Sequence, residues 1–327
     1  MLSRVAESIH WMARYIERAE NVARIMDANY HMILDLPAGV GEQWEPLVVT
    51  TGDEQRFAEL YPQFNQENVV QFLTFDPRNP NSILSCLQAA RENARSVREL
   101  ISSEMWQQVN SFYLMLKDAS RQGGRIELPH EFFVEIMMAS HLFAGLTENT
   151  MTHGEGWEFA RLGRMLERAD KTARIIDVKY FILLPSVEYI GMPYDHILWG
   201  ALLRSASAFE MYRKRYGQIV PDRIIEFLVL DTEFPRAIHH CLITAEQALR
   251  NISGTRRGRF TNPAEKTLGR LLADIDYTQI EEIKTGGLHE FIDNLQTRLN
   301  DVGSAVYETF FAYPVTPAAV TTAQTGE

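Results

Sequence analysis

Two stretches of the chain place the same charged side chains at the same spacing. Residues 14–34 read RYIERAENVARIMDANYHMIL and residues 164–184 read RMLERADKTARIIDVKYFILL, and 10 of the 21 aligned positions are identical. Six shared positions are charged or phenolic: Arg14/Arg164, Glu17/Glu167, Arg18/Arg168, Arg24/Arg174, Asp27/Asp177 and Tyr30/Tyr180. Apolar periodicity alone preserves a helical core, whereas solvated charges are free to drift. The retained polar set therefore indicates a constraint on its pairing or its chemistry.

In a helix, these charges form a stripe opposite a broad apolar face. With about 100° of rotation per residue, the first stripe contains Arg14, Glu17, Glu20, Arg24 and Asp27, and the second contains Arg164, Glu167, Asp170, Arg174 and Asp177. Opposite charges follow one another at i+3 and i+4, the spacing of helical ion pairs. His10 and His31 share the first face, but Ala160 and Phe181 replace them in the second copy. The common pattern therefore excludes both histidines.

Three interpretations of the stripes remain open. In the first, they form structural ion pairs, either exposed or buried where the repeats meet. Loss of one buried partner then leaves the other charge buried and unpaired, at a cost of roughly 3–5 kcal/mol. Alternatively, they line a polar cleft in which the arginines grip carboxylates or phosphates and Glu17 or Glu167 transfers protons. The third interpretation is a face that docks a partner protein.

Other chemistry-bearing patterns are scarce. Metal sites in helical bundles use ExxH pairs on facing helices. The predicted helices do not offer two such strings that could face each other, so no metal ligand is predicted. Neither GxxxxGK[ST] nor GxGxxG is present, so no bound nucleotide or other cofactor is expected. The two cysteines, Cys86 and Cys241, have no metal-ligand spacing and occupy matching positions of the two halves, as small core residues do.

The elements that must position the stripes are helices. Apolar residues recur at three- and four-residue spacing in 5–34, 83–118, 131–151, 157–184, 197–216, 222–231, 236–253, 264–284 and 288–312, and no run alternates as a strand does. This pattern predicts an all-α fold, a many-helix bundle built from two tandem pseudo-symmetric repeats.

The internal similarity extends beyond the stripes. Residues 72–95 align with 227–250 at an offset of 155, with nine of 24 positions identical. We therefore predict a first helical repeat at 1–150 and a second at 151–313, packed as one compact unit. The tail 314–327 has no apolar periodicity and is predicted to be disordered.

Composition and charge exclude several classes of function. The chain of 327 residues has an ordinary globular composition, 46% hydrophobic and 23% charged. Its net charge of −11 disfavours nucleic acid as a partner, because a phosphate-backbone binder needs a positive footprint. Charges interrupt the N-terminal apolar residues, and no segment approaches the ~20 apolar residues of a membrane span. We expect a cytoplasmic protein without membrane contact.

At the ERAENVARIMD and ERADKTARIID motifs the chain resembles the alpha-E family, bacterial helical proteins named for a Glu-Arg motif. The amino-terminal MLSRVAESIHWMARYIERAEN resembles the family's start. NPNSILSCLQAARENARSVRELISSEMW at 79–106 and GEGWEFARLGRMLERAD at 154–170 resemble its other characteristic segments. The resemblance covers residues 1–312 and depends on these strings together, since a lone ER dipeptide is common.

The resemblance implies a role beside other proteins. Family members occur fused to, or encoded beside, circularly permuted ATP-grasp proteins and transglutaminase-like proteins, which implies ATP-dependent peptide or amide bond formation. ATP and Mg would then bind the ATP-grasp partner. The motif residues carried over are Glu17, Arg18, Glu20, Arg24, Glu167, Arg168, Asp170, Arg174, Arg91, Glu92, Asn93, Ala94 and Arg95, and the full RENAR string occurs only in the first half. Glu17 and Glu167 are the catalytic candidates among them, and all the others except Ala94 are candidates for binding a substrate or an anion.

These implications give one expected function and two alternatives. The expected function is a helical accessory or substrate-binding subunit of an amide-ligase system, with an ATP-grasp protein and a transglutaminase-like protein as partners. The first alternative is an enzyme in its own right, which uses a Glu/Arg cleft. The second is a structural scaffold with buried ion pairs.

Overall fold

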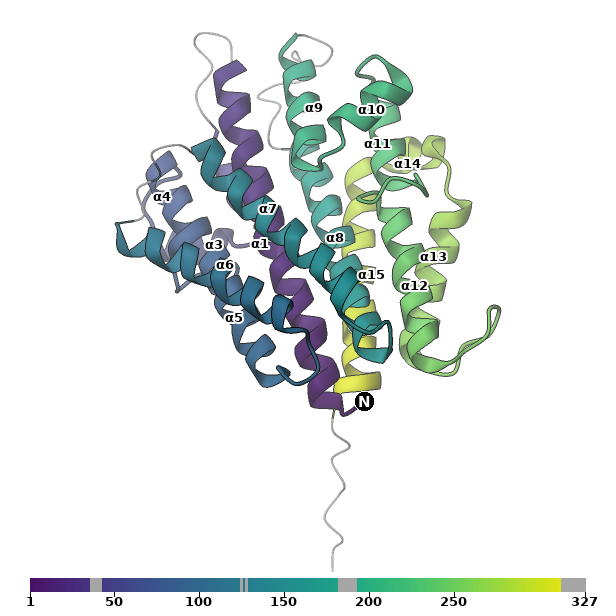
Figure 1. Ribbon diagram of the computed structural model, residues 1–327. Helices are drawn as coiled ribbons and strands as arrows, with labels where there is room; N and C mark the ends of the chain where they lie inside the picture. Colours follow the sequence, from purple (N-terminus) through teal and green to yellow (C-terminus); the bar gives the residue numbers. More distant parts are fainter. Residues whose placement is uncertain (36–42, 124–125, 127–128, 182–192, 313–327) are drawn as a thin grey trace, which may run out of the picture.

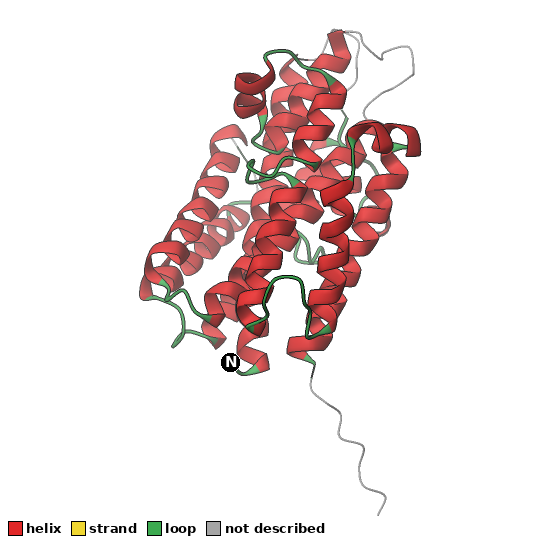
Figure 2. Cartoon of the chain, turned by 90° about the vertical axis from the view of Figure 1, so that its right-hand side faces the viewer, coloured by secondary structure: helices red, strands yellow, loops and turns green. Residues whose placement is uncertain are grey.

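The regular structure of the protein is helical throughout the part of the chain that is described. The computed structural model describes residues 1–35, 43–123, 126, 129–181 and 193–312, and these contain helices and no strand (Figure 2). The predicted all-α class is confirmed. The predicted disordered tail, 314–327, lies outside the described residues. No described helix has the combined length and apolar character that a bilayer crossing requires.

The chain order of the elements places one long helix at the start of each half. The first half contains α1 (Ser3–Asp35), α2 (Glu45–Thr51), α3 (Glu54–Leu60), α4 (Gln66–Val70), the π-helical turn η1 (Gln71–Phe75), α5 (Ile83–Ser96), α6 (Ser103–Arg121) and α7 (Pro129–Thr150). The second contains α8 (Glu155–Phe181), α9 (Pro193–Ser205), α10 (Phe209–Tyr216), α11 (Pro221–Val229), α12 (Ile238–Ser253), α13 (Pro263–Tyr277), α14 (Ile280–Gly286), α15 (Leu288–Val306) and the π-helical turn η3 (Tyr307–Phe311).

Three of the predicted helices are each divided in two. The prediction over 83–118 was wrong at residues 97–102, where Ser102 begins a new helix by accepting a hydrogen bond from the amide of Met105. The run 264–284 is interrupted at Gln279, which forms a capping box with Glu282. The run 197–216 is interrupted by Ser207, whose φ is +48°. In each case apolar periodicity continues across a local cap that redirects the chain.

α1 and α8 form the centre of the bundle (Figure 1). α5, α7 and α9 pack against α1, and α12 and α15 pack against α8. α1 and α8 also pack against each other, and they approach closely at Gly163, where a Cβ would lie 2.5 Å from the carbonyl oxygen of His10. A larger residue at that position would force the two helices apart.

The central position of α1 leaves little of its charged stripe exposed. Glu17, Glu20 and Arg24 are 2%, 1% and 4% exposed, although a wheel of the isolated helix places them opposite its apolar face. Packing on several sides buries the polar face as well as the apolar one. Each buried charge must therefore be paired with an opposite charge or a hydrogen-bonding group.

Candidate functional site

The two ER dipeptides pair with each other across the contact between α1 and α8. Arg168 donates to both carboxylate oxygens of Glu17, from Nε at 2.9 Å and Nη2 at 2.8 Å. Arg18 donates to both oxygens of Glu167, from Nε at 2.6 Å and Nη2 at 3.1 Å. Each motif thus supplies the counter-ion of the other, in the bidentate geometry that guanidinium and carboxylate favour.

We call the first of these clusters the Glu17 centre, comprising Glu17, Glu20, Asn21, Arg24, Arg168 and Arg236. Arg236 lies just before α12 and donates from Nη1 to Glu17 Oε1 at 3.1 Å and to Asn21 Oδ1 at 3.2 Å. Its Nη2 donates to Glu20, which also accepts from Arg24 within α1. The sequence offered no local signal for Arg236, because it stands in a turn.

Helix α7 covers the Glu17 centre. Figure 1 shows α7 crossing in front of α1 and α8, and its Ser140 hydroxyl donates to Glu20 Oε2 at 2.6 Å. His141 Nε2 lies 3.2 Å from Glu20 Oε1 and 2.8 Å from Arg24 Nη2. These contacts cover the centre with α7, and Glu17 and Glu20 are buried beneath it.

We call the second cluster the Glu167 centre, comprising Arg14, Arg18, Asn81, Glu167, Asp170, Lys171 and Arg174. Arg14 Nε donates to Glu167 Oε2 at 2.9 Å, and Lys171 Nζ lies 3.7 Å from Glu167 Oε1. Arg18 also donates from Nη1 to Asn81 Oδ1 at 2.8 Å. Asp170 accepts from Arg174 Nε at 3.0 Å and from Lys171 at 3.0 Å.

The two centres differ by an exchange of one amide and one cation. On the central helix, Asn21 of the Glu17 centre corresponds to Lys171 of the Glu167 centre in the internal alignment. In the turn before α5 or α12, Asn81 of the Glu167 centre corresponds to Arg236 of the Glu17 centre. Each centre therefore holds one amide and one additional cation, although the elements that supply them are interchanged. The two exchanged positions therefore contribute one positive charge to each centre, although the residue types differ.

The electrostatics of both carboxylates follow from burial opposed by these cations. Burial raises the pKa of Glu17, but Arg168 and Arg236 outweigh it and hold the pKa below its usual range. Burial likewise opposes Arg18 and Arg14 at Glu167, whose pKa is held well below its usual range. Burial lowers the pKa of the Arg236 guanidinium to about 10. Both carboxylates are therefore ionised and ion-paired, whereas a proton-transfer group needs a pKa near the working pH.

Arg14 and Arg164 occupy corresponding positions but have different environments. Arg14 bonds Glu167, whereas Glu17 is already held by Arg168 and Arg236. Arg164 Nε is buried without a hydrogen-bond partner among the described residues, and burial lowers the pKa of the Arg164 guanidinium. Each carboxylate thus has a second arginine, but Arg236 bonds the Glu17 oxygen that accepts Arg168 Nε. Arg14 instead bonds the Glu167 oxygen that accepts Arg18 Nη2.

A polar cleft opens above the Glu167 centre. It has a volume of about 280 Å³ and lies between α1, α8, α15 and the turn after α2, lined by Arg14, Arg18, Thr51, Gly52, Asn81, Leu166, Asp170, Lys171, Arg174, Leu299 and Asn300. Gly52 has φ +77°, and a Cβ there would lie 2.9 Å from Arg174 Nη1. A glycine is therefore needed for the arginine to lie along this wall.

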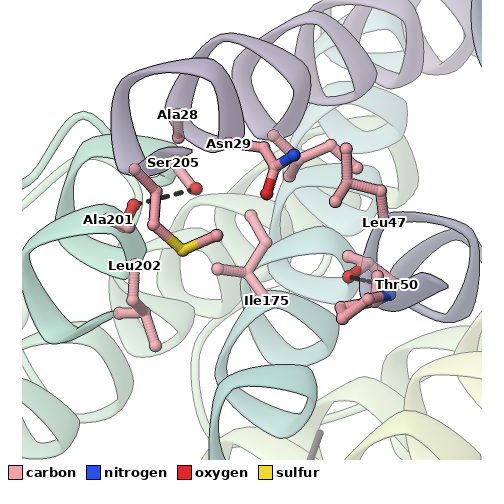
Figure 3. A pocket seen from close by; sticks show the side chains of 11 residues that line it. Ala28, Asn29, Leu47, Thr50, Ile175, Ala201, Leu202 and Ser205 are labelled. Carbon is pink, nitrogen blue, oxygen red and sulfur yellow. Dashed lines mark hydrogen bonds between the residues drawn. The ribbon is translucent and has the colours of Figure 1, made fainter. Parts of the chain in front are cut away.

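A smaller, mainly apolar cavity lies beside the same helices (Figure 3). Its volume is about 50 Å³, and Ile25, Met32, Leu47, Ile175 and Leu202 provide most of its apolar lining. The hydroxyls of Thr50 and Ser205 donate to backbone carbonyls of their own helices. Asn29 Nδ2 is buried there without a partner among the described residues. The space suits a water molecule beside Asn29 better than an organic ligand.

The last members of both stripes lie apart from the two centres and pair with histidines. Asp27 Oδ1 lies 2.7 Å from His130 Nδ1, and Asp177 Oδ1 lies 2.8 Å from His289 Nδ1. Asp177 raises the pKa of the His289 imidazole above its usual value. The stripe is therefore a series of separate pairs and not one continuous site.

The charged RENAR residues lie at least partly exposed on α5, and Arg91 contacts α6. Arg91 Nε donates to Asn110 Oδ1 at 2.8 Å, and Arg91 and Arg95 pair with Glu92 at 3.3 and 3.1 Å. Arg95 is 67% exposed, Asn93 is half-buried, and Ala94 is buried against the core. The contacts of these charged residues lie within α5 and α6, so the structure does not place them with the ER motifs.

Comparison with protein families finds an ER motif in the description of the family model that matches the chain. A family model described as a predicted alpha-helical domain with a conserved ER motif, Alpha-E, matches residues 1–311. The chain belongs to the Alpha-E family. In this Alpha-E protein both ER dipeptides are buried at one helix contact, where the Glu of each is neutralised by the Arg of the other.

Relatives of this Alpha-E chain are longer proteins. An uncharacterized protein of Mycobacterium bovis is 21% identical over 341 aligned residues, which cover 95% of this chain and 37% of the relative. Two uncharacterized proteins of Mycobacterium tuberculosis strains are 21% and 20% identical with the same coverage. The chain thus spans about 37% of the length of these relatives. No solved structure matches it.

Proposed function

We propose that this chain is a helical accessory and substrate-binding subunit of an ATP-dependent peptide or amide ligase system. In this proposal an ATP-grasp partner binds ATP and Mg and activates a carboxylate, and the cleft above the Glu167 centre holds an anionic group of the substrate. The family's association with ATP-grasp and transglutaminase-like proteins supports the choice of system. The relatives' greater length is consistent with an Alpha-E unit that works beside further domains.

The observation that carries the substrate-binding role is the surplus of cationic groups along the cleft. Arg14, Arg18, Lys171 and Arg174 line it, and their side chains are between 13% and 24% exposed. The bonds from Arg14 to Glu167 and from Arg174 to Asp170 use the Nε atoms. A guanidinium has five N–H donors in a planar fork, so these bonds occupy only part of what each fork offers an incoming carboxylate or phosphate.

The test combines the purified chain with a cognate ATP-grasp protein. Complex formation is measured by calorimetry, and ligation is followed by ADP release and by mass spectrometry of the product. Arg174→Gln should leave the complex intact and raise the KM for the carboxylate substrate on the order of 10-fold, the value of a charge-assisted hydrogen bond. Arg121→Gln, the same substitution at an exposed arginine of α6, is the matched control.

Two results would argue against the proposal. If the two proteins fail to associate and ligation proceeds equally without this chain, the accessory role is wrong. If association and ligation depend on the chain but Arg174→Gln leaves KM unchanged, the chain docks the partner and the cleft is not its substrate site.

A structural scaffold is the second candidate function, and the reciprocal ER pairs favour it. Two fully paired, buried carboxylates need no substrate to account for their retention. Under this alternative, Glu17→Gln lowers the melting temperature, and any pathway activity falls only in proportion to the folded fraction. The enzymatic alternative, with Glu17 or Glu167 as acid or base, stays a prediction that the lowered pKa values of both groups disfavour.

A further inference from the structure

Three potential metal ligands converge where the end of α1 meets the start of α7. Asp27 and His31 stand one turn apart on α1, and His130 is the second residue of α7. His130 Nδ1 lies 2.7 Å from Asp27 Oδ1 and 3.1 Å from His31 Nε2, and His31 Nε2 lies 3.9 Å from Asp27 Oδ2. The three ligand atoms all lie within 4.8 Å of one another.

Hydrogen bonding alone does not account for this convergence. His130 Nδ1 carries at most one proton, so it can donate to Asp27 or to His31, but a single linear bond cannot serve both. When it donates to Asp27, the lone pair of a neutral His31 Nε2 lies 3.1 Å away without a proton between them. A cation placed between the three atoms satisfies all of them at once. In tetrahedral zinc coordination, neighbouring ligand atoms are roughly 3.3 Å apart, within the range of the three distances observed.

The second half of the chain provides an internal reference for the cluster. His289 Nδ1 lies 2.8 Å from Asp177 Oδ1, so the pair of one carboxylate and one histidine is present there too. The position that corresponds to His31 is Phe181, a residue type that has no ligand atom. Among the residues that the structure describes, the second half therefore offers two ligands where the first half offers three.

We propose that Asp27, His31 and His130 bind a divalent transition-metal ion of the zinc type. Two imidazoles and one carboxylate form the ligand set of open, three-ligand zinc sites, which leave a fourth position for water or for an anionic ligand. His31 and His130 are 41% and 58% exposed, so an ion enters directly from solvent and the fourth position faces outward. The ion ties α1 to α7, the helix that covers the Glu17 centre.

The experiment is a zinc titration of the full chain without an affinity tag, by calorimetry and by competition with a chromophoric chelator, with Co²⁺ absorption as a second readout. The wild-type protein should bind one ion at this cluster and show the visible bands of tetrahedral Co²⁺. His31→Phe, which copies the second half, should lower the affinity on the order of 100-fold and abolish those bands. His289→Ala, at the two-ligand pair, is the control and should leave both unchanged.

The proposal is wrong if wild-type protein binds no zinc in the micromolar range. It is also wrong if His31→Phe, with helical circular dichroism equal to wild type, binds as tightly as wild type. Asp27→Asn provides a second variant that keeps the side-chain shape, and unchanged affinity in it would contradict the proposal equally.

Discussion

The Glu17 centre and the Glu167 centre are built from the same motif and differ in what covers them. α7 closes the Glu17 centre with Ser140 and His141, whereas a cleft of about 280 Å³ opens above the Glu167 centre, with α15 forming one wall. Both carboxylates are buried and held by a bidentate arginine. Identical motifs therefore serve packing at one position and present cations to solvent at the other, and the difference comes from the surrounding helices.

The strongest test of this difference is the removal of each carboxylate charge. Glu17→Gln should cost about 3–5 kcal/mol, because Arg168 and Arg236 are then left without their full complement of charge in a closed site. Glu167→Gln should cost less, about 1–3 kcal/mol, because water and anions reach Arg14 and Arg18 through the cleft. Urea denaturation with and without phosphate measures both values, and phosphate should restore stability only to Glu167→Gln. Equal losses, or equal rescue, would remove the distinction between a closed and an open centre.

The next test compares the two corresponding arginines. Arg14→Met should destabilise the protein by about 1.5–3 kcal/mol, because it removes a hydrogen bond to a buried carboxylate. Arg164→Met should change stability by no more than about 0.5 kcal/mol, because Arg164 Nε bonds to no described residue and the substitution removes a desolvated charge. Thermal and urea unfolding of the two variants measure the contrast. A large loss for Arg164→Met would show that its guanidinium has a role that the geometry does not reveal.

The dependence of stability on acid pH tests a further difference between the two central helices, because His10 of α1 corresponds to Ala160 of α8. Burial lowers the pKa of His10 to about 3 from its usual 6.5. The folded state therefore binds fewer protons than the unfolded state, and the contribution of His10, complete above pH 6.5, is lost as the pH falls. The loss between pH 6.5 and 5 should be about 2 kcal/mol. His10→Ala should abolish this slope, whereas the loss below about pH 4.5, where Glu17 and Glu167 are protonated on unfolding, should persist in it.

The exchange of an amide and a cation between the two centres predicts a smaller effect on stability, in which the energies of two substitutions are coupled. Arg236→Asn and Asn21→Lys should each destabilise the Glu17 centre, the first by removing a counter-ion and the second by adding a buried charge. Together they reproduce the residue pattern of the Glu167 centre. The double variant should therefore be more stable than the sum of the single losses by about 1 kcal/mol. A double-mutant cycle measures this coupling, and strict additivity would show that the exchange has no energetic basis.

The sequence was sufficient for the fold class and for most members of the two centres. Helical periodicity identified α1 and α8, and internal identity identified Glu17, Glu167 and their arginines. The helical wheel failed to group Arg18 and Arg168 with the stripe, because a wheel represents a long side chain as a point on its own helix. Only tertiary packing shows that each arginine reaches across to the other helix.

Arg236 and Asn81 were missed for a different reason. They stand in turns, and although they occupy aligned positions they differ in residue type, so internal identity did not mark them. The available signal was that both positions change in the same direction, from asparagine in the first half to a cation in the second, at Asn21/Lys171 as well as at Asn81/Arg236. The charges balance only within each centre, because each centre combines residues of both halves. His130 was likewise missed as a neighbour of Asp27, because 103 residues separate them.

The reciprocal ER pairs have a consequence for how the chain assembles. Residues 1–150 alone would leave Glu17 without Arg168 and Arg236, and residues 151–313 alone would leave Glu167 without Arg14 and Arg18. Neither fragment can bury its central helix until the other supplies the missing counter-charge. The halves therefore behave as obligate complements, and a chain split between α7 and α8 should regain helical structure only when both fragments are mixed.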